Sequence, residues 1–385
     1  MRHPSGFGLF VLVASLSSGC MPPYQMVSAP MPERSCPIDA AQQANPTRET
    51  DDSLSWYVPE ASADNQRLEQ WCQTVAEPVV VAAPPAHFGP LMPGDSLFVA
   101  TWNNNAGGGD LLRFLTDEMG LRCSSDGSTL VEGRSHFVLL SQEAFRRSAD
   151  LPEETPRWAI PEAVAEGSRS GARLDVVEVA GRCGLALAYV AAARNGGALR
   201  GGLGEDKGVA MLSTIPLSNI VALELPYEAA RRVAIAATVR DESGESLRLA
   251  SVHLISAAGP ARVLATGNGS RLRQALAVVD ALRQLDLAAA GSDSASGYPV
   301  STVLAGDLNT WSNRESTLRH LREHFPDSPP PPREGTRGPF PTDHLFFRLA
   351  AGPNAPALVE DSYRRLDDRY DSDHHPLVAW LRFAP

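Results

Sequence analysis

Short apolar runs alternate with polar, turn-rich segments along the chain from Leu97 to the C-terminus. Runs of this length, rich in β-branched and aromatic residues and bounded by turns, favour buried β-strands. The expected strands cover residues 97–103, 136–143, 185–193, 208–213, 233–240, 247–254, 298–307, 344–350 and 375–383. Many strands with interspersed helices predict an α/β fold in which two sheets pack together and helices lie outside.

Two segments show the spacing of helices instead. Residues 110–120 end at a glycine, which commonly terminates a helix. Residues 270–285 carry apolar side chains at helical spacing, namely Leu272, Leu276, Val279 and Leu282. This second helix therefore has one apolar face to bury against a sheet.

The first twenty residues resemble an export signal. Arg2 and His3 precede an apolar run over residues 7–16, which is too short to span a bilayer as a helix. The run leads to SSGC, which ends at Cys20 and resembles a bacterial lipobox, although Ser17 stands where Leu is expected. We expect lipidation at Cys20 and an outer-membrane or periplasmic location; secretion without a lipid and a retained anchor stay open.

Residues 21–95 are predicted to be a tether and N-terminal extension, because residues 21–60 are rich in Pro, Ser, Ala, Asp and Gln. One domain is predicted over residues 96–385, where the strand pattern begins. The 385 residues are 43% hydrophobic, enough for a sizeable core. The net charge of −11 argues against binding nucleic acid by basic patches alone, but not against an acidic site that recruits a divalent cation to meet a phosphate.

Four cysteines remain when Cys20 is set aside, and export would permit them to form disulfides. We favour the pairs Cys36–Cys72, which would tie down the N-terminal extension, and Cys123–Cys183, inside the main domain. Unpaired, buried cysteines are the alternative. The sequence has no CxxC, so it does not favour a zinc or redox site.

Polar side chains end several of the predicted strands. They are Asn103, Glu143, His253, Asp307, Asn309, Asp373 and His374, and Asp343 begins a further strand. Asp307 and Asn309 are two residues apart and would share one face of an extended chain. Carboxylate and amide oxygens suit Mg²⁺, Mn²⁺ or Ca²⁺, and histidines transfer protons near neutral pH. The set therefore predicts the rim of one site for metal-assisted phosphoester hydrolysis.

The order WN, QE, HL, GDLN, TDH and SDHHP resembles the endonuclease/exonuclease/phosphatase superfamily over residues 96–384. The segment Gly208–Leu217 also resembles a strand and turn in the middle of that domain. The resemblance implies a four-layer α/β-sandwich, with two mixed, mainly antiparallel sheets flanked by helices. It also implies a hydrolase that depends on Mg²⁺, Mn²⁺ or Ca²⁺.

The resemblance further implies a role for each residue of the motifs. Glu143 would be the principal metal ligand, with Asn103 beside it and Asp373 at the same or a second metal.

Five residues would be catalytic. Asp307 would approach the attacking water, and Asn309 would contact the phosphate. His374, oriented by Asp343, would bind the phosphate and move a proton, and His253 would face the leaving group.

Simpler interpretations stay open for some of these residues. Asp307 could serve only its turn, Glu143 could end a strand in solvent, and His253 could be a core histidine with a satisfied hydrogen bond. His375 would point away from His374 in an extended chain and is left out of the site.

Two pairs of polar residues, Arg194–Asn195 and Arg231–Arg232, are as consistent with a solvated surface as with phosphate contacts.

The leading hypothesis is a nuclease-type phosphodiesterase that acts on nucleic acid outside the cytoplasm, attached to a membrane through its lipid anchor. A lipid headgroup phosphodiesterase or phosphatase is the first alternative. A non-catalytic lipoprotein that uses the fold for binding is the second. No sequence feature indicates a protein partner.

Overall fold

The protein is described by a computed structural model that covers residues 24–29, 54–59, 70–71, 74–82, 88–123, 136–149, 151, 174–195, 205–228, 230–256, 268–290 and 300–385. The predicted signal peptide, Cys20 and the expected pair Cys36–Cys72 lie outside these residues. No helix within them is long and apolar enough to cross a membrane.

The first sheet has seven strands in the order β1-β2-β8-β9-β10-β11-β12. Their bounds are Tyr24–Ala29, Leu54–Pro59, Ser218–Glu224, Val233–Arg240, Ser246–His253, Ser301–Asp307 and Asp343–Arg348. The pairs β2–β8 and β10–β11 are parallel, and the other neighbours are antiparallel.

The second sheet follows the order β13-β15-β4-β5-β7-β6-β3, and β14 also pairs with β15. The bounds, in this order, are Ala357–Leu358, Leu377–Arg382, Ser96–Asn103, His136–Arg147, Glu205–Ser213, Ala186–Arg194 and Val79–Val81, with β14 at Arg364–Arg365. Only β4 and β5 run parallel, so both sheets are mixed and mainly antiparallel.

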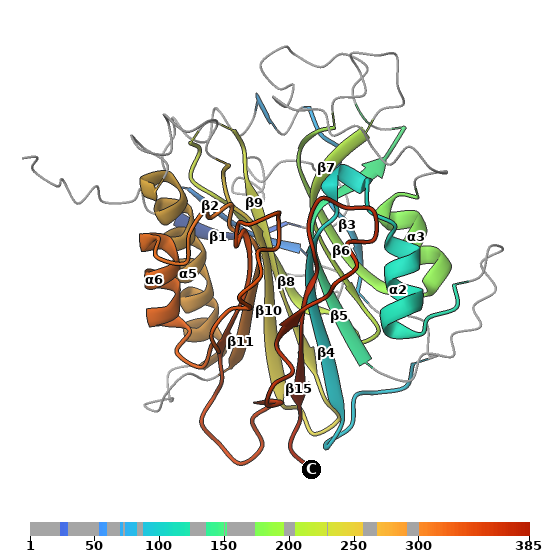
Figure 1. Cartoon of the computed structure of the whole chain (residues 1–385), viewed down its shortest axis with the longest axis vertical. Helices are drawn as coiled ribbons and strands as arrows, with labels where there is room; N and C mark the ends of the chain where they lie inside the picture. Colours follow the sequence, from blue (N-terminus) through green and yellow to red (C-terminus); the bar gives the residue numbers. More distant parts are fainter. Residues whose placement is uncertain are drawn as a thin grey trace, which may run out of the picture.

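Helices cover the outer faces of the two sheets (Figure 1). Helices α5 (Asn268–Ala290) and α6 (Ser316–His324) pack on the first sheet, and α2 (Leu111–Met119) and α3 (Val176–Cys183) pack on the second. A third apolar cluster, which draws on strands of both sheets, fills the space between them. The predicted four-layer α/β-sandwich is therefore confirmed.

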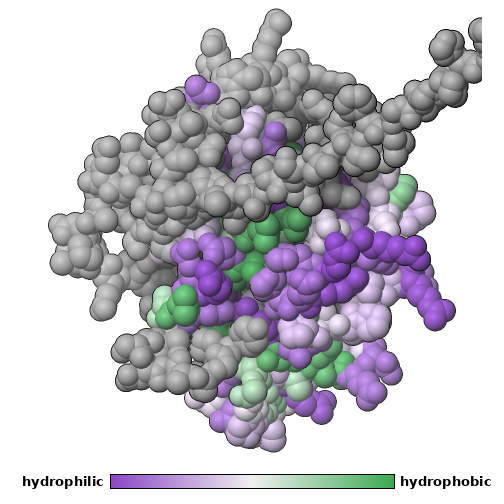
Figure 2. Space-filling model, turned by 90° about the vertical axis from the view of Figure 1, so that its left-hand side faces the viewer, coloured by the Kyte–Doolittle hydropathy of each residue, from purple (hydrophilic) through white to green (hydrophobic). Residues whose placement is uncertain are grey.

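Both predicted helices form, although only α2 does so entirely as the sequence pattern predicts. The Asp110 side chain accepts a hydrogen bond from the Arg113 amide and caps α2, and Gly120 ends it in the left-handed conformation. Helix α5 buries Ala275, Val278 and Leu282 against the first sheet. Leu272 and Leu276 of the predicted apolar face are only partly buried, because the buried face is turned toward the alanines. On the side of the molecule that α5 and α6 occupy, the described surface is mainly hydrophilic, with smaller hydrophobic areas (Figure 2).

Strands from the segment expected to be a tether take part in the sheets. Strand β2 pairs with β8 in the first sheet, and β3 pairs with β6 in the second. Trp56 and Leu54 of β2 are buried in the core between the sheets. The chain therefore contributes to the sandwich well before residue 96. The sequence pattern did not predict this, because these pairings are non-local and leave little trace in the local pattern.

The expected disulfide between Cys123 and Cys183 is present. It joins the segment after α2 to the last residue of α3, so it ties together the two helices that cover the second sheet.

Candidate functional site: a cluster around Asp307

Strand register places three of the predicted residues side by side. His253 ends β10 and pairs with Asp307, which ends the parallel neighbour β11. Asp307 in turn pairs with Asp343, the first residue of the antiparallel strand β12. The three side chains therefore lie in one row at the same edge of the first sheet.

The close approach of β10 and β11 depends on Gly306, the residue before Asp307. Its φ is +149°, and a Cβ atom there would lie 1.8 Å from the Val252 carbonyl oxygen. Any other residue would push the strands apart and move the Asp307 carboxylate.

Glu143 reaches the site through a break in the regular strand. The register of β5 against β7 shifts between Gln142 and Ala144, which marks a β-bulge. Glu143 has a φ of +49°, a conformation that costs free energy for a residue other than glycine. Bulges of this kind redirect side chains next to functional sites, and here the bulge turns Glu143 toward His253.

The Asp307 carboxylate is the centre of the cluster. Its Oδ2 accepts a hydrogen bond of 2.9 Å from the Asn103 side chain, which belongs to the other sheet. Its Oδ1 accepts a hydrogen bond of 2.7 Å from the backbone amide of Asn309. The Asn309 side chain donates to the Leu254 carbonyl at 3.0 Å, so Asn309 is fixed beside Asp307.

His374 and Asp343 form a buried pair. The distance from His374 Nδ1 to Asp343 Oδ2 is 2.7 Å, and His374 Nε2 lies 3.9 Å from Asp307 Oδ2. Burial alone would lower the pKa of His374, but the charges of Asp343, Asp307 and Asp373 raise it to about 9. At neutral pH the imidazolium therefore directs its Nε2 proton into the site.

The loop that carries His374 is held from several sides. The Trp102 indole donates a hydrogen bond of 3.1 Å to the His374 carbonyl. The Ser372 hydroxyl donates to the Asn103 carbonyl and accepts from the His374 amide. The His374 ring therefore keeps one position relative to the end of β4.

The pKa of Asp307 is raised to about 7, first by burial and then by the neighbouring charge of Asp343. A carboxylate with this pKa can accept a proton near neutral pH, as a general base requires.

His253 lies on the opposite side of Asp307 from His374. Its Nε2 is 3.5 Å from Asp307 Oδ2 and 4.0 Å from Glu143 Oε1. Burial, followed by the charge of Arg232, holds the pKa of His253 well below its usual value. Arg232 Nη1 lies 3.5 Å from Nδ1, and a guanidinium only donates, so Nδ1 carries the lone pair and Nε2 carries the proton.

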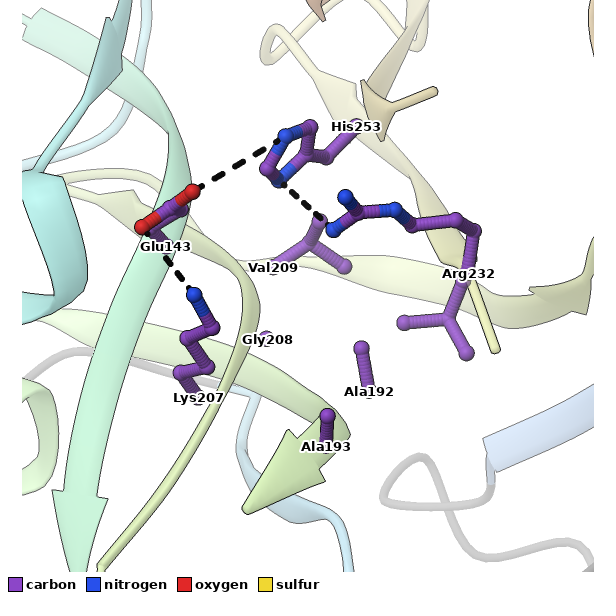
Figure 3. A pocket seen from close by; sticks show the side chains of 9 residues that line it. Glu143, Ala192, Ala193, Lys207, Gly208, Val209, Arg232 and His253 are labelled. Atoms are coloured by element: carbon purple, nitrogen blue, oxygen red, sulfur yellow. Dashed lines mark hydrogen bonds and ion pairs between the residues drawn. The ribbon is translucent and has the colours of Figure 1, made fainter. Parts of the chain in front are cut away.

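A pocket opens beside His253 and Glu143 (Figure 3). It has a volume of about 280 Å³ including its open mouth, and residues of β5, β6, β7, β9 and β10 with Arg232 line it. Lys207 Nζ lies 3.3 Å from Glu143 Oε2. Burial works against ionisation of Glu143, but the charge and hydrogen bond of Lys207 and the charge of Arg232 lower its pKa to about 2.

No protein-family model and no curated protein matches the sequence. Among solved structures, an endonuclease/exonuclease/phosphatase from Beutenbergia cavernae is 18% identical with a TM-score of 0.45, and the match covers 75% of this chain and 72% of that one. The chain resembles the endonuclease/exonuclease/phosphatase superfamily.

Two other solved structures match at a similar level. Sphingomyelinase C from Streptomyces griseocarneus is 15% identical with a TM-score of 0.39, over 75% of this chain and 99% of that one. A mutant beta toxin from Staphylococcus aureus with bound magnesium ions is 12% identical with a TM-score of 0.39, over 75% and 99%. Similarity at this level assigns no activity, substrate or metal to this chain.

The sequence motifs predict a divalent cation, and the oxygen donors of the site suit one. Glu143 is ionised, and its Oε1 approaches the same His253 nitrogen as Asp307 Oδ2. Both carboxylates therefore lie beside the His253 Nε2–H, and carboxylate oxygens are ligands that Mg²⁺ prefers. Lys207 forms an ion pair with Glu143 Oε2. A metal ion bound to Glu143 would therefore have to share the carboxylate with the lysine ammonium or displace the ammonium.

Asp307, Asp343 and His374 also offer ligand atoms within 4.8 Å of one another. His374 Nδ1 already donates to Asp343, however, and the protonated ring has no lone pair for a metal. Of the two positions, Glu143 with Asp307 is therefore the better cation site.

Asp373 lies on the His374 side of the cluster. It pairs with Arg337 at 2.6 Å, and its Oδ1 lies 3.8 Å from His374 Nε2. Within the described part of the chain, no hydrogen bond or ion pair joins Asp373 to Glu143 or Asn103. The structure thus brings the predicted catalytic residues together with Asn103 and Glu143, while Asp373 stands apart from the other expected metal ligands.

Lys207 was not among the predicted site residues, and the role of Arg232 was left undecided. Lys207 directly precedes the superfamily-like segment that begins at Gly208, which is the signal that could have drawn attention to it.

The other polar residues that were left undecided are not solvated. Arg231 is 2% exposed and binds Glu224 and the Ala191 carbonyl. Arg194 is buried, and Asn195 donates to Glu205. His375, as expected, points away from the site and contacts the Leu366 carbonyl.

Proposed function

We propose that this protein hydrolyses phosphoester bonds with a divalent cation, and that its preferred substrates are phosphodiesters of the nucleic-acid type. One observation carries the proposal. A single buried carboxylate, Asp307, accepts a hydrogen bond from Asn103 and lies within 4 Å of the Nε2 atoms of both His374 and His253. Groups of both sheets thus converge on one point.

The protonation states divide the work among the residues. Asp307, with its pKa raised to about 7, accepts the proton of the attacking water. The water oxygen forms the new bond to phosphorus as the bond to the leaving oxygen breaks. His374 is cationic, so it stabilises the negative charge on the phosphoryl oxygens and can give its Nε2 proton to the leaving oxygen.

His253 has a different part, because its ring is neutral. A neutral imidazole is a very weak acid, so its Nε2–H contributes a hydrogen bond to the substrate rather than a proton. One proton of the Asn309 side-chain amide binds the Leu254 carbonyl. The other proton and the side-chain oxygen can contact the phosphate.

A divalent cation held by Glu143 and Asp307 would polarise a phosphoryl oxygen and offset the charge that develops on it.

An exposed aromatic pair beside the site supports a nucleic-acid substrate. Trp311 is 43% exposed, Phe340 is 37% exposed, and their rings lie 4.8 Å apart. Trp311 follows Asn309 by two residues, and Phe340 precedes Asp343 by three. Stacking of a base on such a side chain is worth about 1–3 kcal/mol.

A parallel assay tests the proposed function. The purified full chain is given Mg²⁺ and plasmid DNA, sphingomyelin, inositol phosphates or bis(p-nitrophenyl) phosphate. We expect hydrolysis of the generic diester and of DNA, and loss of both with EDTA. Turnover of sphingomyelin alone would replace the nuclease proposal with the lipid alternative, and turnover of none of them would contradict hydrolysis.

Export and lipid attachment at Cys20 belong to the same proposal. They rest on the N-terminal sequence alone. We expect Cys20→Ser to move the protein from the membrane fraction to the soluble fraction. A wild-type protein that is already soluble after fractionation would contradict lipid attachment.

A further inference from the structure

Arg232 is a cation without a carboxylate partner. Within the part of the chain that the structure describes, no Asp or Glu lies within ion-pair distance of it, and its enclosed Nε has no hydrogen-bond partner. Its one polar contact joins Nη1 to His253 Nδ1 at 3.5 Å. Glu143 and Asp307 act on Arg232 only from beyond ion-pair distance, and its enclosed Nε is left without an acceptor. A guanidinium in this position can take an anion that enters the pocket.

The walls of the pocket show what kind of group fits. Two basic side chains, Arg232 and Lys207, line the pocket together with one carboxylate, Glu143. Basic side chains thus outnumber carboxylates in the pocket, in a protein whose net charge is −11. The remaining walls are small and apolar, including Ala192 and Ala193, which weakens screening by water and strengthens the attraction for an anion.

The place of the pocket links it to the substrate. His253 and Glu143 belong both to the pocket and to the cluster around Asp307. A group in the pocket would therefore lie next to the scissile phosphate and form part of the same molecule. A quaternary ammonium headgroup is disfavoured there, since it would meet two cations.

We propose that this pocket binds a second phosphate of the substrate, next to the one that is cleaved, through Arg232 and Lys207. The interpretation of the pocket as a substrate subsite rests on the proposed hydrolysis. The substrate class is then a molecule with at least two phosphates close together, either successive phosphates of a nucleic acid or a small molecule with two phosphate groups.

Phosphate binding tests the pocket without turnover. Inorganic phosphate is titrated into the full chain in EDTA, and affinity is measured by calorimetry while the Arg232 Nε–H signal is followed by NMR. We expect this signal to shift with phosphate, and Arg232→Gln to weaken binding about 10- to 100-fold, since a hydrogen bond to a charged group is lost. Arg232→Lys, which keeps the charge, should retain part of the affinity.

Arg240→Gln is the matched control, because Arg240 is exposed at the other end of β9 and its loss changes the net charge equally. It should bind phosphate as the wild type does. An equal loss in Arg240→Gln, or an Arg232 signal that phosphate does not shift, would overturn the proposal.

Two substrate pairs distinguish the source of the second phosphate. One compares thymidylyl-thymidine with the same dinucleotide bearing a 5′-phosphate, and the other compares inositol monophosphate with an inositol bisphosphate. A lower KM for the dinucleotide with the 5′-phosphate supports a nucleic acid. A lower KM for the inositol bisphosphate supports a small molecule with two phosphates. Arg232→Gln should remove either preference. No preference in both pairs overturns the proposal.

The two proposals fail in different ways. Turnover of single-phosphate esters without phosphate binding at Arg232 would leave the hydrolysis standing and remove the subsite. Phosphate binding at Arg232 without turnover of any ester would remove the hydrolysis and its substrate interpretation.

Discussion

The two sides of Asp307 differ in how far their charged groups are paired within the protein. On one side, which we call the dyad half, His374 and Asp343 are buried and bonded to each other at 2.7 Å, and Trp102 and Ser372 hold the loop that carries them. On the other side, the pocket half, Glu143, Lys207, Arg232 and His253 surround a hollow that opens to solvent, with contacts of 3.3 to 4.0 Å.

This difference separates a part built before binding from a part that ligands complete. The dyad half has its charges paired within the protein. In the pocket half, no described carboxylate lies within ion-pair distance of Arg232, and Glu143 is paired with Lys207. Variants of the dyad half should therefore affect turnover, and variants of the pocket half should affect binding of cation and anion.

The largest expected effect comes from the dyad half. His374→Ala should lower turnover by about 10²–10⁴-fold, because a general acid and a positive charge beside the phosphate are lost. Metal affinity should change little. Turnover and metal titration check this, with His375→Ala as the control from the next position in the chain. A larger loss in His375→Ala would mean that the wrong histidine has been placed in the site.

Glu143→Gln should affect the pocket half. A neutral amide replaces the ionised carboxylate, so metal affinity should fall by about 10- to 100-fold, the range that follows when a group supporting a metal site is lost. Excess Mg²⁺ should restore part of the rate. The check is a Mn²⁺ titration followed by turnover at high Mg²⁺, and an unchanged Mn²⁺ affinity would contradict a cation at Glu143.

Asp343→Asn should alter the protonation of His374. The pKa of His374 is about 9 in the fold, above its usual 6.5, so its charge stabilises the fold fully below pH 6.5 and this contribution is lost as the pH rises through 9. Without the Asp343 charge, the pKa should fall. NMR titration of the imidazole in EDTA measures it, and a wild-type ring that titrates at or below pH 6.5 would refute the pairing.

The smallest expected effect comes from Lys207→Gln. The ion pair with Glu143 contributes about 1 kcal/mol at this partial exposure, so freeing the carboxylate should strengthen Mn²⁺ binding by about fivefold. The same variant should weaken phosphate binding to the pocket. Calorimetry with each ion measures both; weaker Mn²⁺ binding would show that Lys207 and the cation do not compete.

The sequence predicted the dyad half better than the pocket half. Polar residues at strand ends predicted the row of His253, Asp307 and Asp343, because neighbouring strands bring such ends to one edge. Nothing local distinguishes Arg232, which has no carboxylate partner in the described structure, from Arg231, which is buried against Glu224. Only the three-dimensional pairing of strands separates these neighbours.

The features that the sequence did not reveal share a physical cause. The bulge at Glu143 exists only in the register of β5 against β7. Lys207 joins the site only because this register brings it to the Glu143 carboxylate. Strands β2 and β3 join the sheets through partners more than a hundred residues away. Such non-local pairings cannot be derived from hydrophobic periodicity.

One measurement tests the central claim most directly, because Asp307 belongs to both halves. The initial rate of bis(p-nitrophenyl) phosphate hydrolysis is compared for the wild type in Mg²⁺, the wild type in EDTA, and Asp307→Asn in Mg²⁺. The wild type should be active only with Mg²⁺, and Asp307→Asn should be slower by about 10²–10⁴-fold, since its amide cannot accept the proton of water. Equal rates for Asp307→Asn and wild type, or a rate that EDTA leaves unchanged, would contradict the account.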